Sequence, residues 1–141
     1  MHNILDLIIL FLSAFLAATI FPAGSEILLA TLDSSNKYNK FLLVIIATIG
    51  NVLGSLVNWF LGFYLLKLRN KKWFPLKEKQ IKKYRNYYQK WGIWSLLFAW
   101  LPIIGDPLTI IAGMFKTNIC LFLLLVTIGK LTRYLIIIYL F

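Results

Sequence analysis

The chain has 141 residues, of which 60% are hydrophobic, and its 15 basic and five acidic side chains give a formal net charge of +10. Soluble domains usually carry about 45–50% apolar residues, so this composition excludes an ordinary soluble core. The one cysteine, Cys120, excludes an internal disulfide and a multi-cysteine metal site. The one histidine, His2, stands beside the start of the chain and is unavailable to a catalytic triad or dyad. We therefore expect a protein that is not an enzyme and that needs no metal or cofactor.

Three long apolar blocks predict an all-α integral membrane protein. They cover residues 4–32 with an interruption at 21–26, residues 41–66 without a charge, and residues 91–141 with a polar division at 116–118. A helix needs about 20 apolar residues to span a bilayer, and the second block and both halves of the third meet this length. The start of the chain has no Lys or Arg and carries Asp6, which does not fit a secretory signal peptide.

A basic linker, residues 67–90, joins the two halves of the chain and holds ten basic residues against one acid. Short loops rich in Lys and Arg stay on the cytoplasmic side of a membrane. Pro75 can begin a helix, and four residues then repeat at spacings of three and four: Ile81, Tyr84, Tyr88 and Trp91. Two interpretations fit: an interfacial helix whose lysines bind anionic headgroups, and a solvated loop that only fixes topology. A net charge confined to one segment predicts no nucleic-acid binding.

The two halves, residues 4–66 and 91–141, resemble each other. Residues 22–26 align with 102–106, each with a proline, a glycine and a terminal carboxylate, and residues 48–51 align with 127–130 about eighty positions apart. Each repeat is therefore predicted to be a proline-broken segment followed by an unbroken helix that opens with Thr-Ile-Gly. Interrupted apolar segments at matching positions in two halves are a sequence sign of a transporter repeat.

The two interruptions, 21–26 and 101–107, contain the residues that break a helix: Pro22, Gly24, Pro102, Gly105 and Pro107. Proline removes a backbone donor and glycine permits a tight reversal. Irregular backbone at membrane depth persists only when it is buried in protein or lines a wet cavity. We expect re-entrant tips and inverted halves, and four plain spanning helices with proline kinks are the alternative.

Four ionisable residues lie inside the apolar blocks: Glu26, Asp106, Lys130 and Arg133. Each costs about 2.5–3.5 kcal/mol at the bilayer centre unless it is paired or hydrated. Lys130 and Arg133 share a helix face and are expected to bind an anionic headgroup, together with Asn51, which aligns with Lys130. Glu26 and Asp106 are expected to line the cavity and relay protons. Mutual neutralisation, or snorkelling of the basic pair to an interface, are the alternatives.

Four segments carry a resemblance to a known family: residues 21–26, 50–54, 98–114 and 129–134. In their order and spacing they resemble the DedA family, also called the VTT or SNARE-associated-Golgi-like family, and its short YqaA-like branch. The resemblance implies two re-entrant elements and transport of polyprenyl phosphate or phospholipid, and Glu26 matches the acidic position of the first element. The chain has Asn51 where typical members have an acid, and Ala99 and Gly105 where they have arginines.

These observations predict a multi-pass protein of the bacterial inner membrane that moves lipid between leaflets as a flippase or scramblase, with proton coupling through the carboxylates. Two alternatives stay open. One is a proton- or cation-coupled transporter of small solutes, and the other is a non-transporting membrane assembly protein. A homodimer is expected because so short a chain supplies few helices to enclose a cavity.

Overall fold

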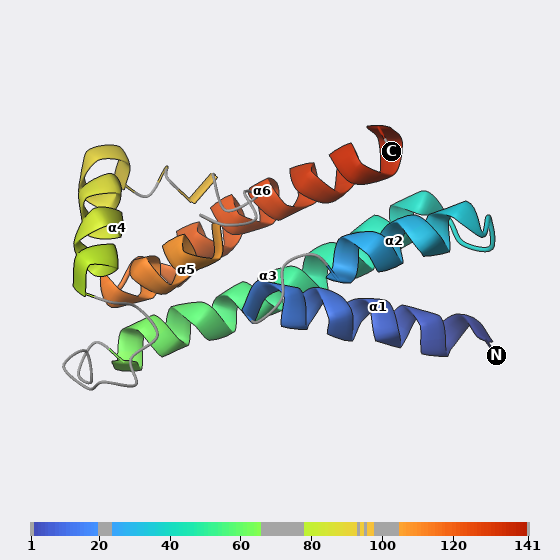
Figure 1. Ribbon diagram of the computed structural model, residues 1–141, viewed down its shortest axis with the longest axis horizontal. Helices are drawn as coiled ribbons and strands as arrows, with labels where there is room; N and C mark the ends of the chain where they lie inside the picture. Colours follow the sequence, from blue (N-terminus) through green and yellow to red (C-terminus); the bar gives the residue numbers. More distant parts are fainter. Residues whose placement is uncertain are drawn as a thin grey trace.

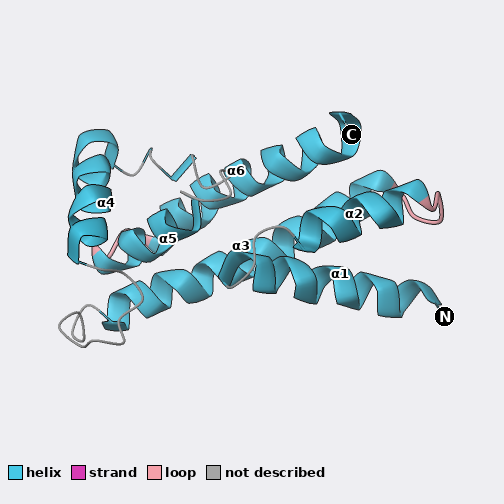
Figure 2. Ribbon diagram, in the orientation of Figure 1, coloured by secondary structure: helices cyan, strands magenta, loops and turns pink. Residues whose placement is uncertain are grey.

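The computed structural model describes residues 2–19, 24–65, 78–92, 94, 96–97 and 105–140. All regular structure in this part of the chain is helical, joined by short turns (Figure 2). The helices are α1 (His2–Thr19), α2 (Gly24–Ser34), α3 (Lys40–Leu65), α4 (Glu78–Trp91), α5 (Gly105–Met114) and α6 (Ile119–Leu140). The expectation of an all-helical chain is confirmed for these residues.

Two helices, α3 and α6, are long and apolar enough to cross a membrane. Their 26 and 22 residues correspond to about 39 and 33 Å of helix, and the hydrocarbon core of a bilayer is about 30 Å thick. By contrast, α2 and α5 have 11 and 10 residues, so each reaches only about half of that thickness. The unbroken second block and the second half of the third block therefore form the two long helices.

The long helices α3 and α6 run antiparallel, and the shorter helices lie along them (Figure 1). Helices α1 and α2 form a hairpin that packs on α3, and α2 also contacts α6. The start of α1 and the end of α2 lie at the same end of the molecule (Figure 1). Helix α5 packs on α3 near the opposite end, where it also contacts α4.

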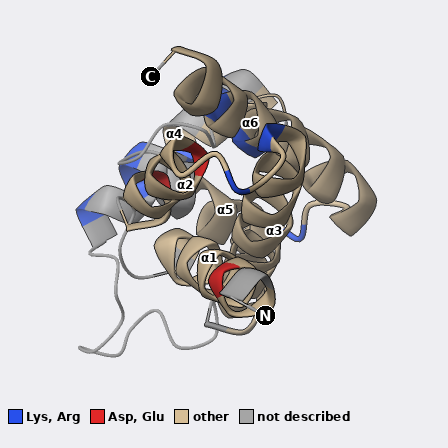
Figure 3. Ribbon diagram, turned by 90° about the vertical axis from the view of Figure 1, so that its right-hand side faces the viewer, with Lys and Arg blue, Asp and Glu red and all other residues tan. Residues whose placement is uncertain are grey.

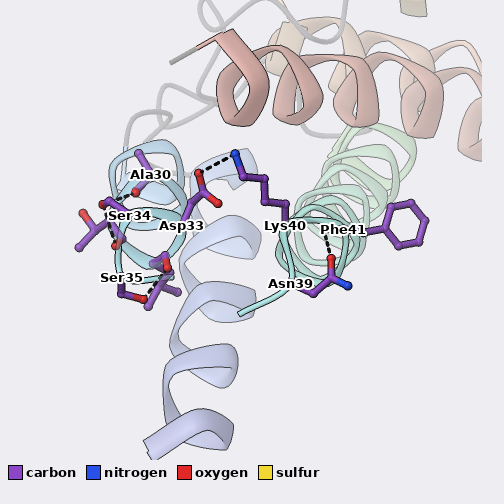
Figure 4. A network of polar contacts seen from close by, with 9 residues as sticks. Ala30, Asp33, Ser34, Ser35, Asn39, Lys40 and Phe41 are labelled. Carbon is purple, nitrogen blue, oxygen red and sulfur yellow. Dashed lines mark hydrogen bonds and ion pairs between the residues drawn. The ribbon is translucent and has the colours of Figure 1, made fainter. Parts of the chain in front are cut away.

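The turns that lead into the two long helices share one arrangement. Asn36 after α2 and Lys116 after α5 both have left-handed backbone, with φ of 57° and 55°, a conformation that commonly ends helices. The Oδ1 atoms of Asn39 and Asn118 then accept a hydrogen bond from the backbone N–H two residues later, at 2.9 and 2.8 Å. These asparagines cap the N-termini of α3 and α6, and Figure 4 shows the first of the two turns.

The prediction that each long helix opens with Thr-Ile-Gly was wrong. Helix α3 begins at Lys40 and α6 at Ile119, so Thr48 lies as far inside α3 as Thr127 lies inside α6. The physical reason is that the capping asparagines, which precede these motifs by two turns of helix, satisfy the first backbone N–H groups. The alignment of the two motifs nevertheless places them at matching depths.

Helix α3 touches its neighbours through glycines. A Cβ atom added to Gly50 or Gly54 would lie 2.5 Å from a carbonyl oxygen of α1. A Cβ atom at Gly62 would meet the backbone of α5, and one at Gly113 of α5 would lie 1.9 Å from the Trp59 carbonyl oxygen. Small residues allow such close contact between backbones, so α1 and α5 are both seated directly against α3.

Two apolar clusters form the interior, and each packs against a different half of the long helices α3 and α6. The first joins α1, α2, α3 and α6 around Leu10, Leu29, Val44 and Tyr134. The second joins α3, α5 and α6 around Trp59, Ala112 and Phe122. Large apolar side chains also remain exposed along the outer faces of α1, α3 and α6, as expected for helices that face lipid.

Candidate functional site

A stripe of buried polar side chains runs along α3 at spacings of three, four and three: Thr48, Asn51, Ser55 and Asn58. Residues at this spacing lie on one face of a helix, and each of these four is at most 5% exposed. Of these four residues, only Asn51 was predicted from the sequence to belong to the site. The helical spacing of the other three was the signal that could have found the whole stripe.

Asn51 connects three other helices. Its Nδ2 donates hydrogen bonds to the Ala14 carbonyl oxygen of α1 at 3.1 Å and to the Tyr134 hydroxyl of α6 at 3.0 Å. The Tyr134 hydroxyl is in turn 2.9 Å from Ser25 Oγ of α2. Both hydroxyl-bearing side chains are buried. A polar network therefore fixes α1, α2, α3 and α6 around a single point.

Asn58 makes the corresponding connection two turns further along α3. Its Nδ2 donates to the Ala18 carbonyl oxygen of α1 at 2.9 Å and to Thr109 Oγ1 of α5 at 3.1 Å. Asn58 thereby joins helices that come from the two halves of the chain.

Glu26 and Arg133, two of the predicted site residues, form an ion pair between α2 and α6. The Arg133 side chain is 9% exposed and that of Glu26 is 31% exposed. Lys130, on the same helix one turn before Tyr134, is fully buried. Figure 3 shows acidic residues on α1 and α2 and basic residues on α6. Glu26 also lies in the first turn of α2, where the positive end of the helix dipole stabilises a carboxylate.

Two buried polar atoms, Thr48 Oγ1 and Asn51 Oδ1, have no hydrogen-bond partner among the described residues. An unsatisfied buried polar atom costs about 1–3 kcal/mol, so such atoms in a native structure call for an explanation. Both atoms lie on the polar stripe of α3, and Asn51 also contacts the Tyr134 hydroxyl. The site therefore retains hydrogen-bonding capacity that a bound group or water could use.

The structure describes only some of the predicted helix-breaking residues. Gly24 and Gly105 are the first residues of α2 and α5, so both helices begin inside the predicted interruptions, and Asp106 and Pro107 lie in the first turn of α5, where proline is tolerated. The side chains of residues 105–107 are outside the described part of the chain, as are Pro22 and Pro102 altogether. The structure thus brings Glu26, Asn51, Lys130 and Arg133 into one region.

An open hollow of about 390 Å³ lies beside the start of α2. It is lined by Ile9, Leu12, Ser13, Leu16 and Gly24, which are mostly apolar. Gly24 directly precedes Ser25 and Glu26 in α2, so the hollow and the polar region share the start of this helix. Within the residues that the structure describes, no three His, Cys, Asp or Glu side chains gather as a metal site would require.

The chain is similar in sequence to several bacterial proteins. It is 33% identical to the inner membrane protein YqaA of Escherichia coli over 136 residues, which cover 95% of this chain and 89% of that protein. It is also 33% identical to an uncharacterised protein of Haemophilus influenzae, covering 96% of this chain and 87% of the relative. Undecaprenyl phosphate transporter A of Staphylococcus aureus is 31% identical, over 74% of this chain and 57% of that protein.

No solved structure matches the chain significantly. The VTT domain matches residues 21–141, which include α2 through α6 and every predicted site residue. Together with the relatives of the YqaA type, this match confirms the resemblance seen in the sequence. The chain belongs to the DedA family of VTT-domain membrane proteins.

Proposed function

We propose that the protein moves an anionic lipid, a phospholipid or a polyprenyl phosphate, between the leaflets of the inner membrane without enzymatic chemistry. The observation that carries this proposal is the Glu26–Arg133 ion pair, which joins α2 to α6 beside the fully buried Lys130. Ionisable groups at membrane depth usually mark a substrate or proton pathway. An apolar hollow lies beside the start of α2, the helix that carries Glu26, which suits a substrate with a charged head and an acyl or prenyl tail.

In the proposed mechanism, a phosphate headgroup replaces the Glu26 carboxylate on Arg133. The planar guanidinium binds phosphate through two parallel hydrogen bonds, and Lys130 adds a second positive charge. Asn51 Oδ1 and Thr48 Oγ1 are the unpartnered atoms of the stripe. In this mechanism they accept hydrogen bonds from hydroxyl groups of the headgroup or from water that accompanies it. Protonation of Glu26 would weaken its hold on Arg133, which couples headgroup binding to a proton. Asp106, which aligns with Glu26 in the sequence, is proposed as a second proton-relay group.

The proposal includes inverted halves whose short helices re-enter the membrane. Helices α2 and α5 are each about half as long as a bilayer core is thick. Each is followed by a left-handed residue, an asparagine cap and a long apolar helix. Such repeats place a substrate site near the midplane, where the halves meet. Asn51 lies near the middle of α3, and Asn58 joins the halves two turns further along. The similarity to the undecaprenyl phosphate transporter A of S. aureus also supports a role in lipid transport.

The test is lipid translocation by the purified protein in liposomes, followed with labelled phospholipid and with polyprenyl phosphate. Arg133→Ala and Glu26→Gln are compared with a matched control pair, Asp33→Asn and Lys40→Gln. The control residues also form an acid–base pair, at 3.6 Å in the α2–α3 turn (Figure 4). We expect the Arg133 variant to lose transport and each control variant to keep it.

Two other results would remove the proposal. Transport that is unchanged in correctly inserted Arg133→Ala protein would show that no headgroup depends on this guanidinium. Absence of lipid movement, together with proton-dependent uptake of a small solute that requires Glu26, would favour solute transport instead.

A further inference from the structure

Helix α4 lies across the other helices at one end of the molecule. Its axis crosses the direction shared by α3, α5 and α6 near the end of α3 and the start of α6 (Figure 1). Since α3 and α6 are the helices able to cross a membrane, a helix that crosses them at their ends runs along the membrane surface. Amphipathic helices of this kind lie in the interface rather than spanning the bilayer.

A specific set of contacts holds α4 against the α5–α6 turn. The Tyr88 ring of α4 stacks on Phe115, with centroids 4.9 Å apart and planes inclined by 2°. The Tyr88 hydroxyl is hydrogen-bonded to Thr117 Oγ1, and the Thr117 carbonyl oxygen accepts a hydrogen bond from Trp59 Nε1 of α3 at 3.2 Å. Helix α4 is thus a fixed part of the fold and not a detached basic segment.

The exposed face of α4 is strongly basic. Five of its side chains are basic and exposed: Lys79, Lys82, Lys83, Arg85 and Lys90. Its one acidic residue is Glu78, and the exposed Lys116 extends the basic surface onto the adjoining turn. Near the opposite end of the molecule, Asp6 and Asp33 offset Lys37 and Lys40. This asymmetry places the α4 end on the cytoplasmic side.

We propose that the basic face of α4 binds the headgroups of anionic phospholipids in the surface of the surrounding bilayer. Two observations favour lipid headgroups as the ligand: the face is basic, and a helix held along the membrane surface lies among headgroups rather than in the solvent. Juxtamembrane lysines each strengthen binding to an anionic surface about five-fold. The inference is independent of whether the protein transports lipid.

The experiment measures which lipids stay bound when the detergent-solubilised protein is equilibrated with equal amounts of phosphatidylglycerol and phosphatidylcholine, repurified and analysed by mass spectrometry. Lys82→Gln/Lys83→Gln removes two exposed charges from α4, and Lys37→Gln/Lys40→Gln removes two exposed charges from the opposite end. We expect the wild type and the second variant to retain phosphatidylglycerol preferentially. The ratio of bound phosphatidylglycerol to bound phosphatidylcholine should be about 25-fold lower in the α4 variant than in the wild type.

Equal lipid preference in all three proteins would overturn the proposal. A second measurement needs no variant: rising salt should reduce the preference of the wild type, because exposed charges are screened within about 10 Å at 0.1 M. Added inorganic phosphate at the same ionic strength should not displace the lipid. Displacement by inorganic phosphate would show a site for the free anion, and tighter binding of a DNA duplex than of phosphatidylglycerol would show a nucleic-acid surface. Either outcome would refute binding to the bilayer.

Discussion

The Glu26–Arg133 ion pair makes a quantitative prediction about stability. Glu26→Gln keeps the shape of the side chain and leaves the Arg133 charge, only 9% exposed, without its carboxylate. Breaking a buried pair from one side costs about 3–5 kcal/mol, and we expect the lower end, about 3 kcal/mol, because Glu26 is 31% exposed. Arg133→Met leaves the better exposed partner, which water can reach or a proton can neutralise, so its cost should be nearer 1–3 kcal/mol.

The assay is equilibrium unfolding in mixed micelles, followed by tryptophan fluorescence, for wild type, both single variants and the double variant. If the ion pair forms, the four free energies of unfolding give a coupling of about 2 kcal/mol, within the range for residues in direct contact. The exposed Asp33–Lys40 pair serves as the control. Its Lys40 side chain is 49% exposed, so the same cycle should yield at most about 1 kcal/mol.

Two results would refute this reasoning. A coupling for Glu26–Arg133 no larger than that for Asp33–Lys40 would mean that the two groups are not held together in the folded protein. A larger loss of stability for Arg133→Met than for Glu26→Gln would mean that the carboxylate, and not the guanidinium, is the group that depends on its partner.

Three further predictions concern other parts of the molecule. Gly113→Ala should lower thermal stability clearly, because its Cβ would lie 1.9 Å from the Trp59 carbonyl oxygen and must push α5 away from α3. The hydrogen bond to Asp6 raises the pKa of Tyr38 to about 12, so Asp6→Asn should move one tyrosinate absorbance step down towards pH 10. The contact therefore stabilises the fold below pH 10, and that stabilisation is lost as the pH rises through about 12. If the α4 end faces the cytoplasm, as we propose, the exposed Cys120 at the start of α6 should react with an impermeant maleimide only after the cells are opened.

Each of these predictions has its control. Ala30→Ser, on the exposed face of α2, should leave the thermal midpoint unchanged, and equal effects of both substitutions would contradict the close contact at Gly113. An unchanged tyrosinate titration in Asp6→Asn would contradict the assigned cause of the Tyr38 shift. Lys37→Cys in a Cys120→Ser background should label in intact cells, and the reverse pattern of labelling would invert the proposed topology.

The sequence predicted the long helices well because their signal is strong. Each is an apolar run long enough to cross a membrane, and one of them, α3, lacks any charge between Lys40 and its end. The starts of the long helices were predicted less well. Several polar residues precede each helix, and only the backbone geometry shows that Asn39 and Asn118 are the ones that cap it.

The site was predictable only in part. The cost of burying a charge made Glu26, Asp106, Lys130 and Arg133 candidates, since charges inside apolar blocks are conspicuous in a sequence, and the structure places Glu26 against Arg133. Which acid meets which base depends on how α2 packs on α6, and this contact joins residues far apart in the chain. The role of Tyr134 was missed for another reason: a tyrosine near a helix end is more often an interface anchor, and only the fold shows that its hydroxyl contacts both Asn51 and Ser25.

The glycine contacts along α3 have a consequence for how its sequence can change. The face that receives α1 at Gly50 and Gly54 and the face that receives α5 at Gly62 are fixed in angle by the residues between them. One residue inserted between Gly54 and Gly62 would rotate one face against the other by about 100°. Substitutions in this interval can be accommodated singly, whereas insertions and deletions would misorient a whole hairpin. The number of residues between the two faces is therefore expected to vary far less than their identity.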